Sequence, residues 1–347
     1  MKLGIAGLLQ TGKSTIFTAL TGARGELDSA AGRSDTRVAT VTVMDERVDF
    51  LSRMFKPKKT TRAKIEYFLP SEISGASASK SESGVWNQLR TADALFHVVR
   101  NFVNMGGEMP ASEDDFRRVE DEMIVSDLLV AEKRIERLDA DRKRGRTPEG
   151  DEEDLLKRCI EVLEKGRPLR LRPELAKAPL LRGFTFLSAK PLLIICNNDD
   201  EDEAPPEWKK MPEGVEMLVV RGRLEMDISS MEQEEAEEFK EAYNIRETVL
   251  DRVISSSFRL LNRISFFTVG SDEVKAWPIA EGTAALDAAG EIHSDIKKGF
   301  IRAEVVSFDD LRQCGGMQEA KKAGLARLEG KEYIVKDGDI INFRFNV

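Results

Sequence analysis

A glycine-bounded motif near the N-terminus constrains the fold of this chain more than any other feature. Residues 2–6 form a short apolar run typical of a buried strand, and residues 13–20 have the composition of a helix. Between them, residues 7–14 read GLLQTGKS and fit the pattern G-x-x-x-x-G-K-[ST]. A loop in this setting presents a concave row of backbone N–H groups that binds phosphate. The motif therefore predicts an α/β domain with a phosphate site in its first loop.

Two side chains of this motif have specific expected roles. Lys13 would reach the β- and γ-phosphates of a nucleotide, and the Ser14 hydroxyl would bind Mg²⁺. The alternative is a chance glycine-rich turn, and the strand before the motif and the helix after it argue against that interpretation. The residues expected to contact the nucleotide are Leu9, Gln10, Thr11, Gly12, Lys13, Ser14 and Thr15, and Ser14 is also the expected metal ligand.

Composition limits the class of protein and its surroundings. A chain of 347 residues with 41% hydrophobic and 33% charged residues has material for two or three soluble domains. Its net charge of −9 excludes a whole-surface attraction to nucleic acid or anionic lipid, so any RNA contact must be local. Three distant cysteines without a CxxC favour a reduced compartment. We expect a cytoplasmic monomer without a membrane span, since the longest apolar run covers only residues 191–196.

The chain divides into three parts by pattern. Apolar strand candidates alternate with helix-length segments in residues 1–108 and 184–262, which predicts a Ras-like sheet covered by helices on both faces. Residues 109–183 predict a charged helical insertion. Residues 263–347 contain a hairpin, a short helix and further strands, which favours a small α+β, ubiquitin-like β-grasp domain. The strand candidates of the first part are residues 38–43, 63–69, 94–99, 192–196 and 217–220.

The insertion carries two apolar stripes separated by a polar turn. The first contains Ile124, Leu128, Ala131, Ile135 and Leu138, spaced 4-3-4-3. A second stripe of Leu156, Ile160 and Leu163 follows residues 142–150. An antiparallel helical hairpin is the simplest prediction. Two surface helices lying on the main domain are the alternative. The basic residues of the turn would contact RNA or remain solvated, and they are Arg142, Lys143, Arg144 and Arg146.

Several strings resemble the YchF or Obg-like ATPase family, and the resemblance extends over essentially the whole chain. They are GLLQTGKST at residues 7–15, DERVD at 45–49 followed by KPKK at 56–59, HVVR at 97–100, and long segments within 266–277, 293–304 and 328–347. The resemblance implies a P-loop nucleotide domain of the TRAFAC type, a coiled-coil hairpin insertion and a C-terminal TGS domain. It also implies hydrolysis of ATP or GTP with Mg²⁺, and an association with ribosomes.

One departure from the family concerns hydrolysis. Where the family has D-x-x-G at the end of a strand, residues 67–72 read YFLPSE, so the metal-holding Asp and the γ-phosphate-sensing Gly are both missing. Pro70 has no N–H to offer, and Glu72 is the nearest carboxylate. Asp45 or Glu66 is the alternative metal ligand. We therefore expect slow or absent hydrolysis, with no catalytic residue assigned, and a pseudo-NTPase interaction scaffold is the alternative function.

The base-reading loops also depart from the family. Asn197 and Asp200 give N-x-x-D, whereas Asn198 and Glu201 give the N-x-x-E of the family, so adenine and guanine stay unseparated. A solvated acidic loop is the alternative. Where the family has Ser-Ala-Lys, this chain has Arg221, Gly222 and Arg223, whose guanidinium groups would stack on a purine, pair with phosphate or remain solvated.

The switch segments and the histidines complete the expectations. Ser34, Thr36 and Thr40 are candidate metal or γ-phosphate contacts, and residues 74–84 occupy the position of the second switch. His97 lies in an apolar strand and is expected to be a satisfied core residue. With two histidines in the chain, a zinc site is not expected.

Overall fold

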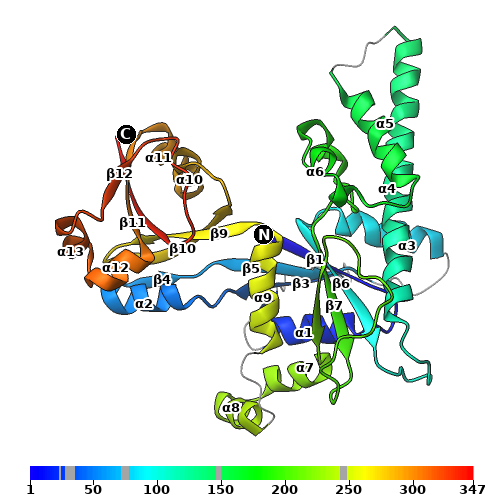
Figure 1. Cartoon of the computed structure of the whole chain (residues 1–347), viewed down its shortest axis with the longest axis horizontal. Coiled ribbons are helices and arrows are strands. Elements are labelled where there is room, and N and C mark those ends of the chain that lie inside the picture. Colours follow the sequence, from blue (N-terminus) through cyan, green and yellow to red (C-terminus); the bar gives the residue numbers. More distant parts are fainter. Residues whose placement is uncertain (23–24, 28–35, 72–77, 146–149, 243–247, 347) are drawn as a thin grey trace. The chain divides into compact units, whose positions relative to one another are not determined.

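The computed structural model describes residues 1–22, 25–27, 36–71, 78–145, 150–242 and 248–346 (Figure 1). Its contacts divide the chain into two compact units. The N-terminal unit comprises Met1–Val41 and Ile65–Val253, and the C-terminal unit comprises Thr42–Lys64 and Ile254–Val347. Ser34, Glu72 and Arg146, which the sequence made candidates, lie outside the described residues, as does part of the segment 74–84.

The N-terminal unit is built on a seven-stranded sheet in the order β2-β3-β5-β1-β6-β7-β8. Neighbouring strands from β5 to β8 run parallel, whereas β2 and β3 pair antiparallel. The predicted strands are confirmed within a few residues at each end. Their bounds are β1 Lys2–Ala6, β2 Gly25–Leu27, β3 Arg37–Thr42, β5 Lys64–Leu69, β6 Ala94–Asn101, β7 Leu192–Asn198 and β8 Glu216–Val220.

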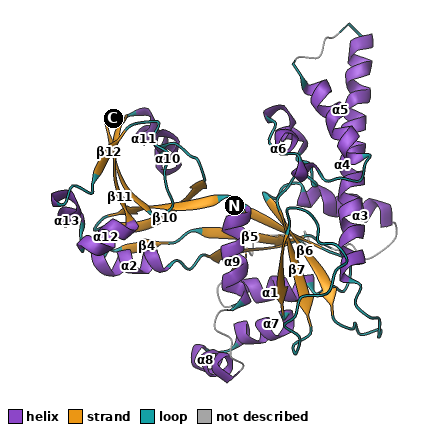
Figure 2. Ribbon diagram, in the orientation of Figure 1, coloured by secondary structure: helices purple, strands orange, loops and turns teal. Residues whose placement is uncertain are grey.

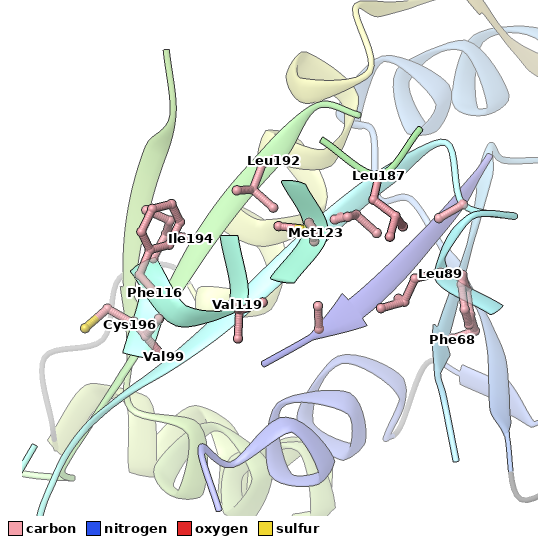
Figure 3. Close-up of a cluster of buried hydrophobic side chains, with 13 residues drawn as sticks. Phe68, Leu89, Val99, Phe116, Val119, Met123, Leu187, Leu192, Ile194 and Cys196 are labelled. Carbon is pink, nitrogen blue, oxygen red and sulfur yellow. The ribbon is translucent and has the colours of Figure 1, made fainter. Parts of the chain in front are cut away.

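Helices cover this sheet on two faces, as the apolar strands predicted. On one face, α1 (Lys13–Thr21) packs beside α7 (Gly222–Ser230). On the other, Phe116, Val119 and Met123 of α4 (Ser112–Lys143) pack over Val99 and Ile194 (Figure 3). The shorter helices of the unit are α3 Ala78–Leu89, η1 Leu169–Leu171, α6 Pro173–Ala176, η2 Pro179–Phe184 and α8 Gln233–Ala242, and α9 is Val249–Leu260. Within the described ranges, no helix combines the length and the apolar character needed to cross a bilayer.

The insertion contains two packed helices, so both apolar stripes are confirmed. Helix α4 has 32 residues, about 48 Å at 1.5 Å per residue. Beyond the sheet it pairs with α5 (Glu152–Leu163), and the two helices share a core of their own. The predicted stripe residues of that core include Ile124, Ala131, Leu138, Leu156 and Leu163. The predicted hairpin and its alternative, helices lying on the main domain, each describe part of the insertion, because α4 begins on the sheet and ends in the helix pair.

The C-terminal unit has a six-stranded sheet in the order β12-β11-β13-β9-β10-β4, with helices next to its strands (Figure 2). Adjacent residues of β9 point to opposite faces, so Phe266 joins the core under α10 and Phe267 joins the core under α2. This alternation buries both faces of the sheet. The elements are α2 Glu46–Phe55, β4 Lys59–Thr61, β9 Arg263–Val269, β10 Glu273–Ala280, α10 Ala285–Ile292, α11 Ser294–Lys298, β11 Phe300–Ser307, α12 Phe308–Cys314, α13 Met317–Lys322, β12 Arg327–Glu329 and β13 Asp339–Phe345.

Residues 42–64 cluster with the C-terminal unit, although the sequence analysis placed them within the first domain. Strand β4 pairs in parallel with β10, and the Thr61 hydroxyl donates to Glu273 Oε1 at 2.5 Å. Arg47 of α2 donates to Asp337 Oδ2 at 2.7 Å. These contacts join residues more than 200 positions apart in the chain, and local sequence patterns carry no information about such pairings.

Candidate functional site

The glycine-bounded loop follows β1 at the carboxyl edge of the sheet, where β1 lies between β5 and β6. Its backbone takes left-handed conformations at Gln10 (φ 61°) and Gly12 (φ 88°), and Gly7 has φ 147°. A Cβ at Gly7 would lie 2.4 Å from the Val98 carbonyl oxygen, and one at Gly12 would lie 2.2 Å from Asn197 Nδ2. Both positions therefore require glycine, for backbone geometry and for space.

Lys13 is folded against its own loop. Its side chain is buried, and its ammonium donates to the Leu8 carbonyl oxygen at 2.5 Å, while the Thr11 hydroxyl donates to the same oxygen at 3.0 Å. The amides of the first turn of α1 have no acceptors within the helix. Gly12 is the N-cap and supplies no side-chain acceptor for them. The loop thus combines an ammonium group with helix-terminal donors, and this arrangement suits a polyanion. Leu9 and Gln10 are exposed and Thr15 is half-buried.

Asn197 joins the phosphate loop to the segment that begins α7. Its Nδ2 donates to the Thr11 carbonyl oxygen at 3.1 Å, and its Oδ1 accepts from the Gly222 amide at 3.0 Å. The side chain is only 4% exposed. A Cβ at Gly222 would lie 2.6 Å from Asn197 Oδ1, so the close approach also depends on that glycine. Asn197 and Gly222 lie in the two predicted base-reading loops, and the buried Asn197 amide links these loops to each other and to the phosphate loop.

Replacing Asn197 with alanine is expected to destabilise the N-terminal unit by about 2 kcal/mol, because two buried backbone groups lose their hydrogen bonds. Asn197→Asp retains an acceptor for the Gly222 amide but loses the donor to Thr11. A smaller loss of stability for Asn197→Asp than for Asn197→Ala would show that the Gly222 hydrogen bond contributes more than the Thr11 hydrogen bond. Urea unfolding followed by tryptophan fluorescence measures both variants. A wild-type midpoint for Asn197→Ala would contradict this role.

The acidic loop after β7 is organised by Asn198. Its Nδ2 donates to the carbonyl oxygens of Asp202 (3.1 Å) and Ala204 (2.7 Å), and its Oδ1 accepts from Asn101 Nδ2 at 3.0 Å. Asp200 is half-buried and its Oδ1 accepts from the Leu224 amide at 3.2 Å. Glu201 is exposed. The loop is therefore a hydrogen-bonded turn in which Asn197 and Asp200 both contact the start of α7.

The two arginines of the 221–223 segment differ in their surroundings. Arg221 Nη1 pairs with Glu203 Oε1 at 2.9 Å and lies 3.5 Å from the Asp200 carbonyl oxygen. Arg223 is exposed. Arg221 thus holds the acidic loop against α7, and Arg223 projects from the helix surface.

Ser14, the candidate metal ligand, contacts an arginine that the sequence analysis did not single out. Arg37, the first residue of β3, donates from Nη2 to Ser14 Oγ at 2.5 Å. Its guanidinium carbon lies 5.2 Å from the centroid of the Phe17 ring. The sequence contains one indication of this contact: Arg37 is a positively charged residue that directly follows the candidate contacts Ser34 and Thr36.

The other candidates for the metal and the switches have structural partners. Asp45 caps α2 and pairs with Arg47 at 2.9 Å, and Glu66 pairs with Lys2 at 3.3 Å. The Thr36 hydroxyl donates to Gln88 Oε1 at 2.7 Å, and Thr40 lies in the β2–β3 ladder. Strand β5 ends at Leu69 and is followed by Pro70 and the buried Ser71.

His97 is a core residue, as expected, but it is not satisfied by hydrogen bonds. It is fully buried in β6 and stacks on Phe116 with ring centroids 5.0 Å apart. Within the described part of the chain, neither ring nitrogen has a hydrogen-bond partner. Burial, together with the positive charges of Arg170 and Lys13, lowers the pKa of His97 to about 3. The imidazole is therefore neutral, and a proton on it would be repelled by the phosphate-loop lysine.

The chain is similar to known proteins along its whole length. Residues 263–346 match the family model YchF-GTPase_C, described as a protein of unknown function (DUF933). The chain is 37% identical to the ribosome-binding ATPase YchF of Bacillus subtilis (strain 168), covering 99% of each chain. It is also 37% identical to the protein of that name from Escherichia coli O157:H7, covering 100% of this chain and 99% of the relative.

Solved structures agree over the same length. The Schizosaccharomyces pombe YchF GTPase superposes with a TM-score of 0.84 and 27% identity, covering 99% of this chain and 97% of that one. A GTP binding protein from Pyrococcus horikoshii OT3 shares the fold, with a TM-score of 0.60 and 18% identity over the whole of both chains. From the full-length identity to curated relatives and the match to the family model, the chain belongs to the YchF family.

Proposed function

We propose that this chain binds a purine nucleotide, ATP or GTP, in the loop of residues 7–14 and hydrolyses it slowly. The proposal rests on one structural observation. The buried Asn197 amide bonds the phosphate loop at Thr11 and the start of α7 at Gly222. A nucleotide whose phosphates lie in the loop would therefore have its base near the 197–201 and 221–223 segments. The membership of the YchF family supports the same site.

The same contact supports one register of the base-reading loop. Asn197 is the residue that reaches the phosphate loop, so the pattern N-x-x-D that starts there is favoured over one that starts at Asn198. Asp200 would then be the carboxylate nearest the base, with Glu201 exposed beside it. The relatives include both an ATPase and a GTPase by name, so both purines belong in the proposal.

The residues at the end of β5 support slow turnover. The residues after this strand are Pro70 and Ser71, and proline has no N–H to offer a γ-phosphate. A P-loop protein without that contact loses part of the charge stabilisation on which phosphoryl transfer depends. The same observation favours the second candidate function, a scaffold that holds nucleotide without turnover.

A ribosomal partner is proposed from the names of the curated relatives, which are ribosome-binding ATPases. The far end of the α4–α5 pair offers the exposed residues Lys143 and Arg144, whereas Arg142 pairs with Asp139 and Glu153. A contact of this kind would be electrostatic. Ribosome co-sedimentation should then fall steeply as salt rises.

Equilibrium titration of fluorescent ATP and GTP, beside a phosphate-release assay, tests the nucleotide proposal. Lys13→Ala is expected to weaken binding about 100-fold, because charge-assisted hydrogen bonds to the phosphates are lost. Lys210→Ala, an exposed lysine of the same unit, is the control. Binding without phosphate release would favour the scaffold. Absence of binding to both nucleotides would eliminate the proposal.

A further inference from the structure

The contact between Arg37 and Ser14 places a fixed positive charge at the hydroxyl that the phosphate-loop motif assigns to a metal. Arg37 Nη2 lies 2.5 Å from Ser14 Oγ. Both residues are exposed, so the pair faces solvent and not the protein core. A divalent cation bound to this hydroxyl would lie within a few ångströms of the guanidinium, where two positive charges repel each other. Arg37 and Mg²⁺ are therefore competitors for one position.

Arg37 is held in this position from a second side. Its guanidinium lies 5.2 Å from the ring centroid of the buried Phe17, one helical turn after Ser14 on α1. An aromatic face attracts a guanidinium and restricts its orientation. Arg37 also begins β3, so its backbone is fixed by the sheet. Such a group loses little freedom when an anion binds, and its planar donors match pairs of phosphate oxygens.

The other groups at this site do not fit a Mg²⁺ ion, as far as the structure describes them. Magnesium prefers an octahedral shell of oxygen ligands that usually includes a carboxylate. The described residues that end β5 are Leu69, Pro70 and Ser71. Asp45 and Glu66, the two described alternatives from the sequence, are paired with Arg47 and Lys2. Among the residues that the structure describes, no cluster of three His, Cys, Asp or Glu side chains could hold a metal.

We propose that Arg37 replaces the metal: its guanidinium binds the terminal phosphates of the nucleotide beside Lys13, so binding does not require Mg²⁺. The inference rests on the proposed function, because it concerns how that nucleotide is held. Arg37 and Lys13 would supply two positive charges on either side of the phosphates, and Ser14 would orient the guanidinium by accepting its hydrogen bond. The metal-holding Asp that the family has at the end of β5 is then not needed, because Arg37 supplies the positive charge in place of the metal.

The test is a titration of fluorescent ATP and GTP against the full-length protein in excess Mg²⁺ and in EDTA. For the wild-type chain the two dissociation constants should agree within about twofold. Arg37→Ala should weaken binding in EDTA roughly tenfold or more, the usual loss for a charge-assisted hydrogen bond. Arg37→Lys should recover part of the affinity, since lysine keeps the positive charge but lacks the planar, paired donors of the guanidinium. Arg118→Ala, an exposed arginine of the same unit, is the control.

Three results would overturn the inference. The first is wild-type affinity that falls about tenfold or more in EDTA, which would make the metal essential. The second is Arg37→Ala that binds more tightly than wild type in Mg²⁺, which would make Arg37 an obstacle to the metal. Both leave nucleotide binding intact and contradict only this inference. The third, absence of binding in either condition, contradicts the proposed function as well. A thermal melt checks that Arg37→Ala is folded.

Discussion

Replacing Asp127 with alanine is expected to lower the free energy of unfolding of the N-terminal unit by about 3 to 5 kcal/mol, the usual cost of breaking a buried ion pair. Asp127 lies on α4 and is fully buried. Its carboxylate accepts from Arg90 Nη1 at 2.7 Å, from the amides of Leu187 (3.0 Å) and Ser188 (2.7 Å), and from the Ser188 hydroxyl at 2.8 Å. The side chain therefore connects the insertion helix to the end of α3 and to the segment before β7.

Alanine at this position would leave the nearly buried Arg90 guanidinium and two amides without their acceptor. Thermal unfolding should show the loss as a decrease in Tm of roughly 10 °C for a unit of this size. Asp121→Ala, an exposed carboxylate on the same helix, is the matched control. A Tm for Asp127→Ala equal to that of the control would mean that the carboxylate contributes no net stability.

Lowering the pH from 6.5 to 4.5 is expected to cost the wild-type chain about 2 kcal/mol of stability through His97 alone, at 1.36 kcal/mol per pKa unit. Burial, with the charges of Arg170 and Lys13, lowers the pKa of His97 from 6.5 to about 3. Between these values the unfolded chain binds a proton that the folded chain does not. The contribution of the neutral His97 to stability is therefore present above pH 6.5 and is lost as the pH falls toward 3.

His97→Phe should remove this part of the acid sensitivity, since a phenyl ring keeps the stacking on Phe116 and does not titrate. His97→Leu provides a second variant if the larger ring strains the core. Urea unfolding at several pH values measures the slope of stability with pH. His293→Asn, at the other and exposed histidine, is the control. Parallel slopes for wild type and both His97 variants would contradict the assignment.

The sequence predicted the elements of this chain because their signals are local. Strand β1, the loop of residues 7–14 and helix α1 follow one another within 20 residues, and the apolar period of α4 continues along one helix. The register that we propose for the base-reading loop needed the fold, since Asn197 and Asn198 are neighbours with the same side chain. The contact from Asn197 to Thr11, 186 positions away, separates them.

Other features depended on contacts that no local pattern encodes. The pairing of β4 with β10 moved residues 42–64 to the C-terminal unit. Arg37 reached Ser14 because β3 begins near the start of α1. Asp127 had a visible signal, because it lies three residues after Ile124 and four before Ala131, on the apolar face of α4. A carboxylate on an apolar stripe indicates a buried polar contact, although its partners come only from the fold.

A crystal structure of the chain with a non-hydrolysable ATP or GTP analogue is the sharpest test of nucleotide binding by residues 7–14. We expect phosphate oxygens within hydrogen-bond distance of the amides of residues 9–14, with the Lys13 ammonium moved from the Leu8 carbonyl oxygen to the phosphates. A nucleotide bound elsewhere would contradict the proposal. So would a loop that stays empty at a saturating concentration of the analogue, with Lys13 still donating to the Leu8 carbonyl oxygen.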